Sequence, residues 1–345
     1  MRVDQAKEIA RQWLEENGPE IPGIEGAFIH GSGASLPDDA DLPPISDLDL
    51  MVVIDGPIPA VKLGKFRYRD LLLEVSYLAS GDVASANQVL GQYHMAGSFR
   101  YDGILYDRDG RLTKIQRGVA KDFAKEKWVR RRCEHAADRV LNGFPHNPED
   151  PIPDQINSWL FPNGVLTHVL LVAGLKNPTV RTRYLAAREL LKEYGFSDFY
   201  PLLLMSLGVE YFRKDDAKHL LWSVTEQFDA AMKVVRPDYP FAADISPDGR
   251  VVAIDGSNAM IRQGDYKEAI FWLAATANRC QQVFLRSGDL DLQHRFTLPY
   301  QNMLIQLGLP SPGDLHIAII ETNALLPLVQ AVADAIIEAN PDIHR

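Results

Sequence analysis

The chain has 345 residues, of which 46% are hydrophobic and 24% are charged, a composition typical of globular proteins. Acidic residues outnumber basic ones by 46 to 36, and this net charge of −10 argues against a protein whose whole surface binds nucleic acid. The two cysteines are too few for a disulfide scaffold or a zinc ribbon, and a reducing, cytoplasmic setting is the simplest expectation.

The first part of the chain alternates short apolar runs with turns. Residues 3–16 carry apolar side chains at helical spacing and are followed by Gly18, which predicts an amphipathic helix rather than a signal peptide. Four short apolar runs then have the character of strands, at residues 27–30, 50–54, 71–78 and 103–106.

From about residue 119 the pattern becomes helical. One long helix is predicted at residues 119–143. Further helices are predicted at residues 179–194, 200–212, 215–234, 265–286 and 314–339. Two proline-containing stretches between them, residues 143–155 and 236–257, are predicted to be irregular. The sequence therefore predicts an α+β fold, with a mixed-sheet domain at residues 1–118 and an all-helical domain at residues 119–345.

The most apolar window, residues 158–175, is interrupted by Pro162, Asn163 and His168. A membrane-spanning helix needs about 20 predominantly apolar residues. We therefore predict a buried core helix at this position and no association with a membrane.

Two aspartates stand where an acidic loop leads into the second strand-like run, in the sequence Ser-Asp-Leu-Asp-Leu. Because the side chains of a strand alternate between its faces, Asp47 and Asp49 should project to the same side. Two ionised carboxylates this close repel each other unless a cation lies between them, and Mg²⁺ prefers such oxygen ligands. Glu74, the only charged residue in the run 71–78, would add a third carboxylate if its strand lay beside that of Asp49. Three converging acids suit two-metal phosphoryl or nucleotidyl transfer.

The first strand-like run ends in the tripeptide His-Gly-Ser. Gly31 permits a tight turn and the close approach of the backbone to a phosphate group. The amides that follow, together with the Ser32 hydroxyl, can bind phosphate oxygens where a helix or turn begins. A Gly-Ser turn or an Asp-x-Asp pair is usually structural when it occurs alone, but the order of these features along the chain favours a functional site.

The segments HGS, SDLDLMVV and LEVSY resemble the nucleotidyltransferase superfamily that shares the fold of DNA polymerase beta, and most closely its minimal and antibiotic (aminoglycoside and lincosamide) members. The resemblance covers about residues 26–78. It implies that Gly31 and Ser32 contact the nucleotide phosphates, that Asp47 and Asp49 hold Mg²⁺, with two ions expected, and that Glu74 is the third ligand or the base for the acceptor hydroxyl.

The chain departs from the family pattern after Gly-Ser. Relatives keep a short helix there, whereas this chain has the acidic loop GASLPDDADLPPIS, which contains Pro37, Pro43 and Pro44. Either the helix is shortened to a turn or the loop is an insertion. The acidity of the loop would suit a cationic acceptor molecule.

A triphosphate also needs positive charge from the protein. Spacing of three and four residues places Lys127, Arg131 and His135 along one helical stripe, and we assign Lys127 and Arg131 to nucleotide binding as a hypothesis. The alternative is a solvated face paired with neighbouring acids. Arg181 and Arg183 lie near the start of a later helix, where either a ligand or a carboxylate would have to compensate their charge.

The expected function is an Mg²⁺-dependent nucleotidyltransferase that transfers a nucleoside monophosphate, with ATP as the expected donor, to a hydroxyl of a small, antibiotic-like molecule and releases pyrophosphate. The helical domain would form the opposite wall of the cleft. Two alternatives stay open: a protein hydroxyl as acceptor, as in toxin or antitoxin systems, and a non-catalytic nucleotide-binding regulatory protein. The acidic charge disfavours a nucleic-acid acceptor, and the sequence leaves the oligomeric state open.

Overall fold

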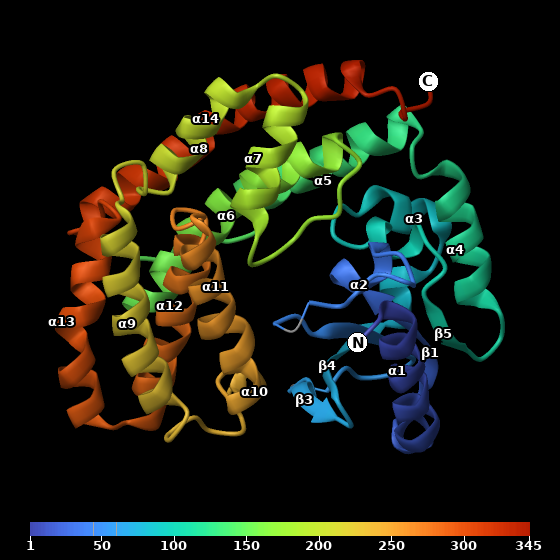
Figure 1. Cartoon of the computed structure of the whole chain (residues 1–345), viewed down its shortest axis with the longest axis horizontal. Coiled ribbons are helices and arrows are strands. Elements are labelled where there is room, and N and C mark those ends of the chain that lie inside the picture. The colour runs from blue at the N-terminus through green and yellow to red at the C-terminus, as the bar shows by residue number, and fades with distance from the viewer. Residues whose placement is uncertain (44, 60) are drawn as a thin grey trace.

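The computed structural model describes residues 1–43, 45–59 and 61–345, so that Pro44 of the acidic loop lies outside the described residues. The fold is α+β, as predicted: a five-stranded mixed sheet lies within about the first 107 residues, and helices follow it (Figure 1). The strands are β1 (Ile24–His30), β2 (Leu48–Ile54), β3 (Gly64–Tyr68), β4 (Leu71–Ala79) and β5 (Ile104–Asp107). Their order in the sheet is β3-β4-β2-β1-β5, and only β2 and β4 pair in parallel.

All four predicted strands are confirmed, but the sequence analysis missed β3. This strand is only five residues long and only half-buried, so it lacks the continuous apolar run of its neighbours. It pairs antiparallel with β4 through a tight turn in which Arg69 adopts a φ of 53°. β3 forms one edge of the sheet, and its side chains prove to matter for the candidate site.

The predicted N-terminal helix is α1 (Val3–Asn17), and it covers one face of the sheet. Its buried residues pack with apolar side chains of all of the first four strands, and Trp13 lies 5.8 Å from Phe66 of β3 between ring centroids. The other face of the sheet joins the core of the helical part through residues such as Phe28 and Val53. Apolar burial on both faces is the main stabilising term for such a sheet.

The prediction of one long helix at residues 119–143 is wrong. The chain forms α4 (Arg111–Asp122) and α5 (Glu126–Asn142), separated by Lys125 in an extended conformation. The C-terminal tail causes the break, because the Glu126 amide donates to the His344 carbonyl at 2.8 Å and the His344 amide donates to the Ala124 carbonyl at 2.9 Å. The division of the chain into domains at residue 118 stays a prediction; that residue lies within α4.

The other helices, in chain order, are α2 (Gly31–Ser35), α3 (Ala86–Gly91), α6 (Ile152–Ala173), α7 (Arg183–Glu193), α8 (Tyr200–Ser206), α9 (Lys214–Ala231), α10 (Pro247–Arg250), α11 (Gly256–Gln263), α12 (Ile270–Ser287), α13 (Leu290–Gln306) and α14 (Pro312–Ala339). The five separate helices predicted after residue 178 are confirmed with shifted bounds, whereas α13 was not predicted. The stretch 236–257, predicted to be irregular, contains α10 and a π-helical turn that leads into α11.

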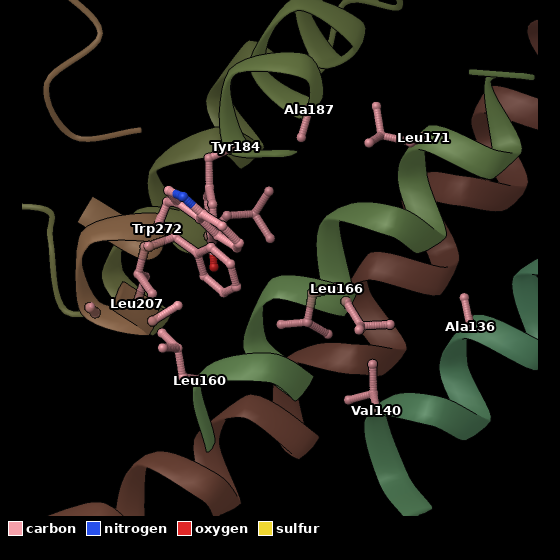
Figure 2. Close-up of a cluster of buried hydrophobic side chains, with 14 of the residues drawn as sticks. Ala136, Val140, Leu160, Leu166, Leu171, Tyr184, Ala187, Leu207 and Trp272 are labelled. Carbon is pink, nitrogen blue, oxygen red and sulfur yellow. The ribbon is translucent and has the colours of Figure 1, made fainter. Parts of the chain in front are cut away.

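The helix α6 is the centre of the helical core. It packs against α5, α7, α12 and α14. Figure 2 shows Leu160, Leu166 and Leu171 of α6 among side chains of α5, α7 and α12. Both α6 and α14 are long and apolar enough to cross a membrane, which is weak evidence of a span. In α6, 89% of the most apolar window is buried, which confirms the predicted core helix. In α14, only 22% of the corresponding window is buried.

In Figure 1 the sheet with α1 and α4 stands on the right, α9 to α13 stand on the left, and α5 to α8 and α14 run across the top. The two sides also meet below this bridge, because β3 contacts the segment 242–250. This arrangement brings a loop of the helical part beside the edge of the sheet that carries the acidic residues.

Candidate metal centre

Polar side chains form one row across four neighbouring strands. The register pairs His30 of β1 with Asp49 of β2, Asp49 with Glu74 of β4, and Glu74 with Lys65 of β3. Residues paired across adjacent strands project to the same face of a sheet. The parallel pairing of β2 with β4 therefore places Asp49 and Glu74 side by side.

The three predicted acids converge. One carboxylate oxygen from each of Asp47, Asp49 and Glu74 lies within 4.8 Å of the others, and all three side chains are half-buried. Ligand atoms bound to one Mg²⁺ at about 2.1 Å lie up to about 4.2 Å apart. The donor set and its spacing thus fit a hard divalent cation with small side-chain adjustments.

Asp49 is held in an unfavourable environment for a charge. Burial, followed by the charge of Asp47, raises the pKa of this carboxyl to about 7, while Lys65 and Lys62 oppose the shift. A raised pKa means that the chain's own groups do not fully compensate the ionised form of Asp49. A bound cation would supply that compensation.

The Gly-Ser turn lies directly against this carboxylate. Helix α2 begins at Gly31 immediately after β1 and runs for five residues, so the short helix is kept and the acidic loop follows it. Gly31 has a φ of +63°, and a Cβ atom there would lie 2.2 Å from Oδ2 of Asp49. A larger residue here would strain the backbone and displace the Asp49 carboxylate. The Ser32 side chain is exposed, and Asn177 of the α6–α7 loop donates to the Gly31 carbonyl at 2.9 Å.

Two lysines that the sequence analysis missed surround the acids. Nζ of Lys65 lies 2.8 Å from Oδ2 of Asp47 and also pairs with Glu74. Lys62, in the loop before β3, pairs with the other oxygen of Glu74. Because β3 itself was not predicted, no strand pairing could be inferred that would bring these lysines to the acids.

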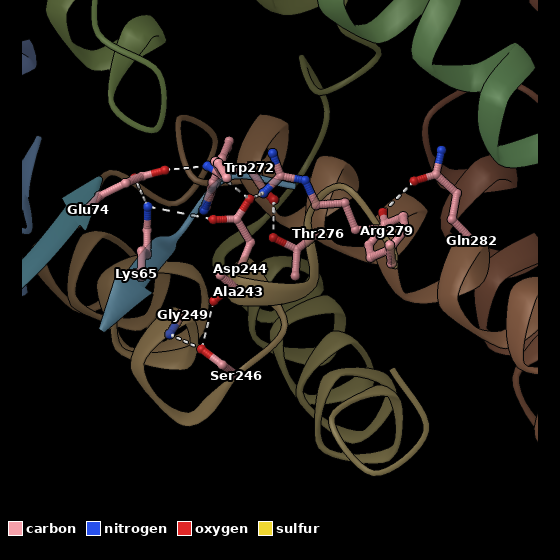
Figure 3. Close-up of polar contacts among 12 residues, drawn as sticks. Lys65, Glu74, Ala243, Asp244, Ser246, Gly249, Trp272, Thr276, Arg279 and Gln282 are labelled. Atoms are coloured by element: carbon pink, nitrogen blue, oxygen red, sulfur yellow. Dashed lines mark hydrogen bonds and ion pairs between the residues drawn. The ribbon is translucent and has the colours of Figure 1, made fainter. Parts of the chain in front are cut away.

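The helical part contributes a fourth carboxylate, Asp244, which ends a 3₁₀ turn (Ala242–Asp244) packed on β3. Its oxygens lie 3.6 Å from Nζ of Lys65, 3.8 Å from Nζ of Lys62 and 3.3 Å from Nη1 of Arg279 (Figure 3). Burial acts to raise the pKa of Asp244, but Arg279 and the two lysines lower it overall. This carboxyl is therefore ionised and enclosed by cations.

The structure does not bring Lys127 or Arg131 to the acids. Both are exposed on α5, a helix that packs against α3, α6 and α14. Lys127 lies over the ring of Trp128 at 5.2 Å, and Arg131 pairs with Glu134 at 3.2 Å. These contacts match the solvated charged face that was the alternative interpretation of the stripe.

Arg181 and Arg183 behave differently from each other. Arg183 is buried, lies 4.1 Å over the Phe271 ring and donates to the Val180 carbonyl. Arg181 is half-buried and lies against the backbone of α11, where a Cβ atom at Gly256 would be 2.9 Å from its Nη1. Burial lowers the pKa of Arg181 and the charge of Asp47 opposes this. Among the residues that the structure describes, no hydrogen bond or ion pair compensates its guanidinium.

Comparison with known proteins finds no protein family whose model matches this chain and no curated protein of significantly similar sequence. The functional argument therefore depends on the geometry of the site itself and on the short motifs within residues 26–78.

Proposed function

We propose that the chain is an Mg²⁺-dependent nucleotidyltransferase, which transfers a nucleoside monophosphate from ATP to a hydroxyl group of a small molecule and releases pyrophosphate. One observation carries the proposal: oxygens of Asp47, Asp49 and Glu74 lie within 4.8 Å of one another beside a glycine turn that touches Asp49. This is the arrangement expected of a metal site that acts on a phosphate group.

Each residue has a role in this proposal. Asp47 and Asp49 hold the metal, which when bound polarises the reacting phosphate and stabilises the leaving group. Glu74 is the proposed third ligand, because one of its oxygens lies within 4.8 Å of oxygens of both aspartates. Gly31 leaves room for the Asp49 carboxylate to lie against the turn, and Ser32 offers an exposed hydroxyl there. Arg181, with its uncompensated charge, replaces Lys127 and Arg131 as the proposed partner of the polyphosphate.

The decisive test compares the wild-type chain with Asp47→Asn and Asp49→Asn by mass spectrometry, after incubation with ATP, Mg²⁺ and a panel of hydroxyl-bearing acceptors. Metal and acid–base groups each contribute roughly 10²-fold or more in rate, so both variants should lose at least about that factor while keeping their fold. Asp39→Asn is the matched control, because Asp39 is an exposed acid of the same loop. Retention of more than about a tenth of the activity in the two variants would contradict the proposal.

The ion pairs at the site favour one alternative, a nucleotide-binding protein without turnover. Lys62 and Lys65 pair with Asp47 and Glu74, so the chain itself supplies part of the positive charge that a metal would otherwise supply. Under this alternative, ATP with Mg²⁺ would raise the melting temperature, and Asp49→Asn would remove the effect, yet no pyrophosphate would appear with any acceptor. The same mass spectra distinguish the third outcome, in which the label is found on protein.

A further inference from the structure

The acidic triad carries its own counter-charges. Lys65 Nζ pairs with Asp47 and Glu74, and Lys62 pairs with Glu74. The pair of Lys65 with Glu74 is shielded from solvent, because the Lys65 side chain is only 9% exposed and that of Glu74 is 13% exposed. Lys62 is more accessible, with 25% of its side chain exposed. An ammonium group therefore lies among the oxygens that would bind a divalent ion.

A divalent ion and this ammonium need the same oxygens. Binding by all three acids would use one oxygen of Asp47, whose Oδ2 Lys65 contacts, and at least one oxygen of Glu74, both of which the two lysines contact. Two cations at such separations repel each other strongly in a half-buried site. Metal entry thus requires that Lys65 move away from Asp47 and Glu74.

Asp244 is placed to receive it. This carboxylate is 8% exposed and already lies 3.6 Å from Lys65 Nζ, so a rotation within the lysine side chain would bring the two into full contact. The position of Asp244 is fixed from two sides: Arg279 holds its other oxygen at 3.3 Å, and the adjacent Ala243 packs so closely on Gly64 of β3 that a Cβ atom there would lie 2.2 Å away. Figure 3 shows Lys65 between Glu74 and Asp244.

We propose that Lys65 is the resident cation of the metal centre, which a divalent ion displaces toward Asp244, so that a residue of the helical part sets how readily the sheet binds metal. The inference rests on the proposed function, because it requires the triad to bind a divalent cation. Lys65 and Asp244 are positioning residues in this scheme: they act through the acids, and they determine metal affinity rather than the chemical step.

The test is a Mn²⁺ titration of the full chain, in which electron paramagnetic resonance measures the concentration of free Mn²⁺. Lys65→Met keeps the length of the side chain and removes the competing charge, so it should raise Mn²⁺ affinity by about tenfold or more. Lys65→Arg keeps the charge and should not raise it. Lys7→Met is the matched control, because Lys7 is also largely buried and paired with an aspartate, Asp38, but lies on α1.

Asp244→Asn provides a second, independent measurement. Without Asp244, Lys65 has only the triad as its partner, so Mn²⁺ affinity should fall, by about threefold to tenfold. This loss should shrink in the Lys65→Met background, whereas a purely through-space effect of the lost charge would persist there. If Lys65→Met fails to fold, Lys62→Met carries the test, with an increase in affinity expected, since Lys62 also pairs with Glu74 and Asp244.

The outcomes separate this inference from the proposed function. One result would overturn the inference and leave the proposed function standing: Asp49→Asn abolishes Mn²⁺ binding, whereas Lys65→Met does not raise the Mn²⁺ affinity. Higher affinity in Lys65→Met without nucleotidyl transfer in any assay would support the inference and count against the enzyme. If neither the wild type nor Lys65→Met binds Mn²⁺, both are overturned.

Discussion

Replacing Gly31 by alanine tests the contact on which the geometry of the centre depends. The added methyl group would lie 2.2 Å from Oδ2 of Asp49, far inside van der Waals contact, at a backbone φ of +63°. The Asp49 carboxylate would have to rotate away from the turn. We expect the substitution to destabilise the fold and to remove a metal ligand at the same time.

The expected loss of folding free energy in Gly31→Ala has two separable contributions. A left-handed backbone costs a residue with a Cβ atom about 1–2 kcal/mol. Forcing the Asp49 side chain off its preferred rotamer costs about 1 kcal/mol more. Gly195 isolates the first term, because its φ is +79° and a Cβ atom there would meet nothing within 4 Å. Gly195→Ala should therefore cost about 1–2 kcal/mol, and Gly31→Ala about 2–3 kcal/mol.

The assay is urea unfolding monitored by circular dichroism, with Mn²⁺ affinity measured on the same samples. Gly31→Ala should shift the unfolding midpoint more than Gly195→Ala does, and it alone should weaken Mn²⁺ binding, by about tenfold or more. Both variants lose the same flexibility in the unfolded chain, so that contribution cancels in the comparison. Equal midpoints and equal Mn²⁺ affinities in the two variants would refute the reasoning.

Three further predictions follow from other contacts. Because burial and the neighbouring aspartate raise the pKa of Asp49 to about 7, protons compete with the metal, and Mn²⁺ affinity should fall between about pH 8 and about pH 6; a flat profile would contradict this. His168 is buried, and burial lowers its pKa well below the usual 6.5. The unfolded chain therefore binds more protons than the folded one below about pH 6.5, so the stabilising effect of the neutral ring is complete above this pH and is lost as the pH falls below it. His168→Gln should reduce the dependence of the urea unfolding midpoint on pH below about 6.5. The same dependence in the variant and the wild type would contradict this role of His168. Gly64→Ala would place a methyl group 2.2 Å from Cβ of Ala243 at a φ of +68°, so hydrogen exchange should speed up in residues 242–250, and unchanged exchange there would show that the packing is looser than described.

The sequence predicted the parts of the centre that depend on local periodicity. Alternation along a strand placed Asp47 and Asp49 on one side, and the lone charge in the run 71–78 marked Glu74. Their convergence was predicted only on the condition that β2 and β4 are neighbours, which the parallel pairing of Asp49 with Glu74 satisfies. A pattern with a period of two residues fixes the face of a strand but not its partner.

The parts that the sequence did not predict depend on contacts between distant segments. Lys65 reaches the acids because a short, half-buried edge strand pairs with β4, and Asp244 reaches Lys65 because a 3₁₀ turn packs on that strand. The break between α4 and α5 likewise depends on the backbone of the C-terminal tail, around His344. Local helix and strand preferences carry no information about such pairings, so tertiary contacts overrode them.

Stability alone does not explain this group of charges. Well-packed apolar residues in place of a buried ion-pair cluster often leave a protein as stable or make it more stable. Among the residues that the structure describes, Asp49 makes no ion pair and Arg181 makes neither an ion pair nor a hydrogen bond, although both are half-buried. Gly31 and Gly256 leave the space that these two side chains occupy. An uncompensated acid and an uncompensated base on the same centre would both be stabilised by one ligand that combines a divalent cation with a polyphosphate anion. The uncompensated charges of Asp49 and Arg181 destabilise the fold, and binding of a metal–nucleotide complex would offset this destabilisation.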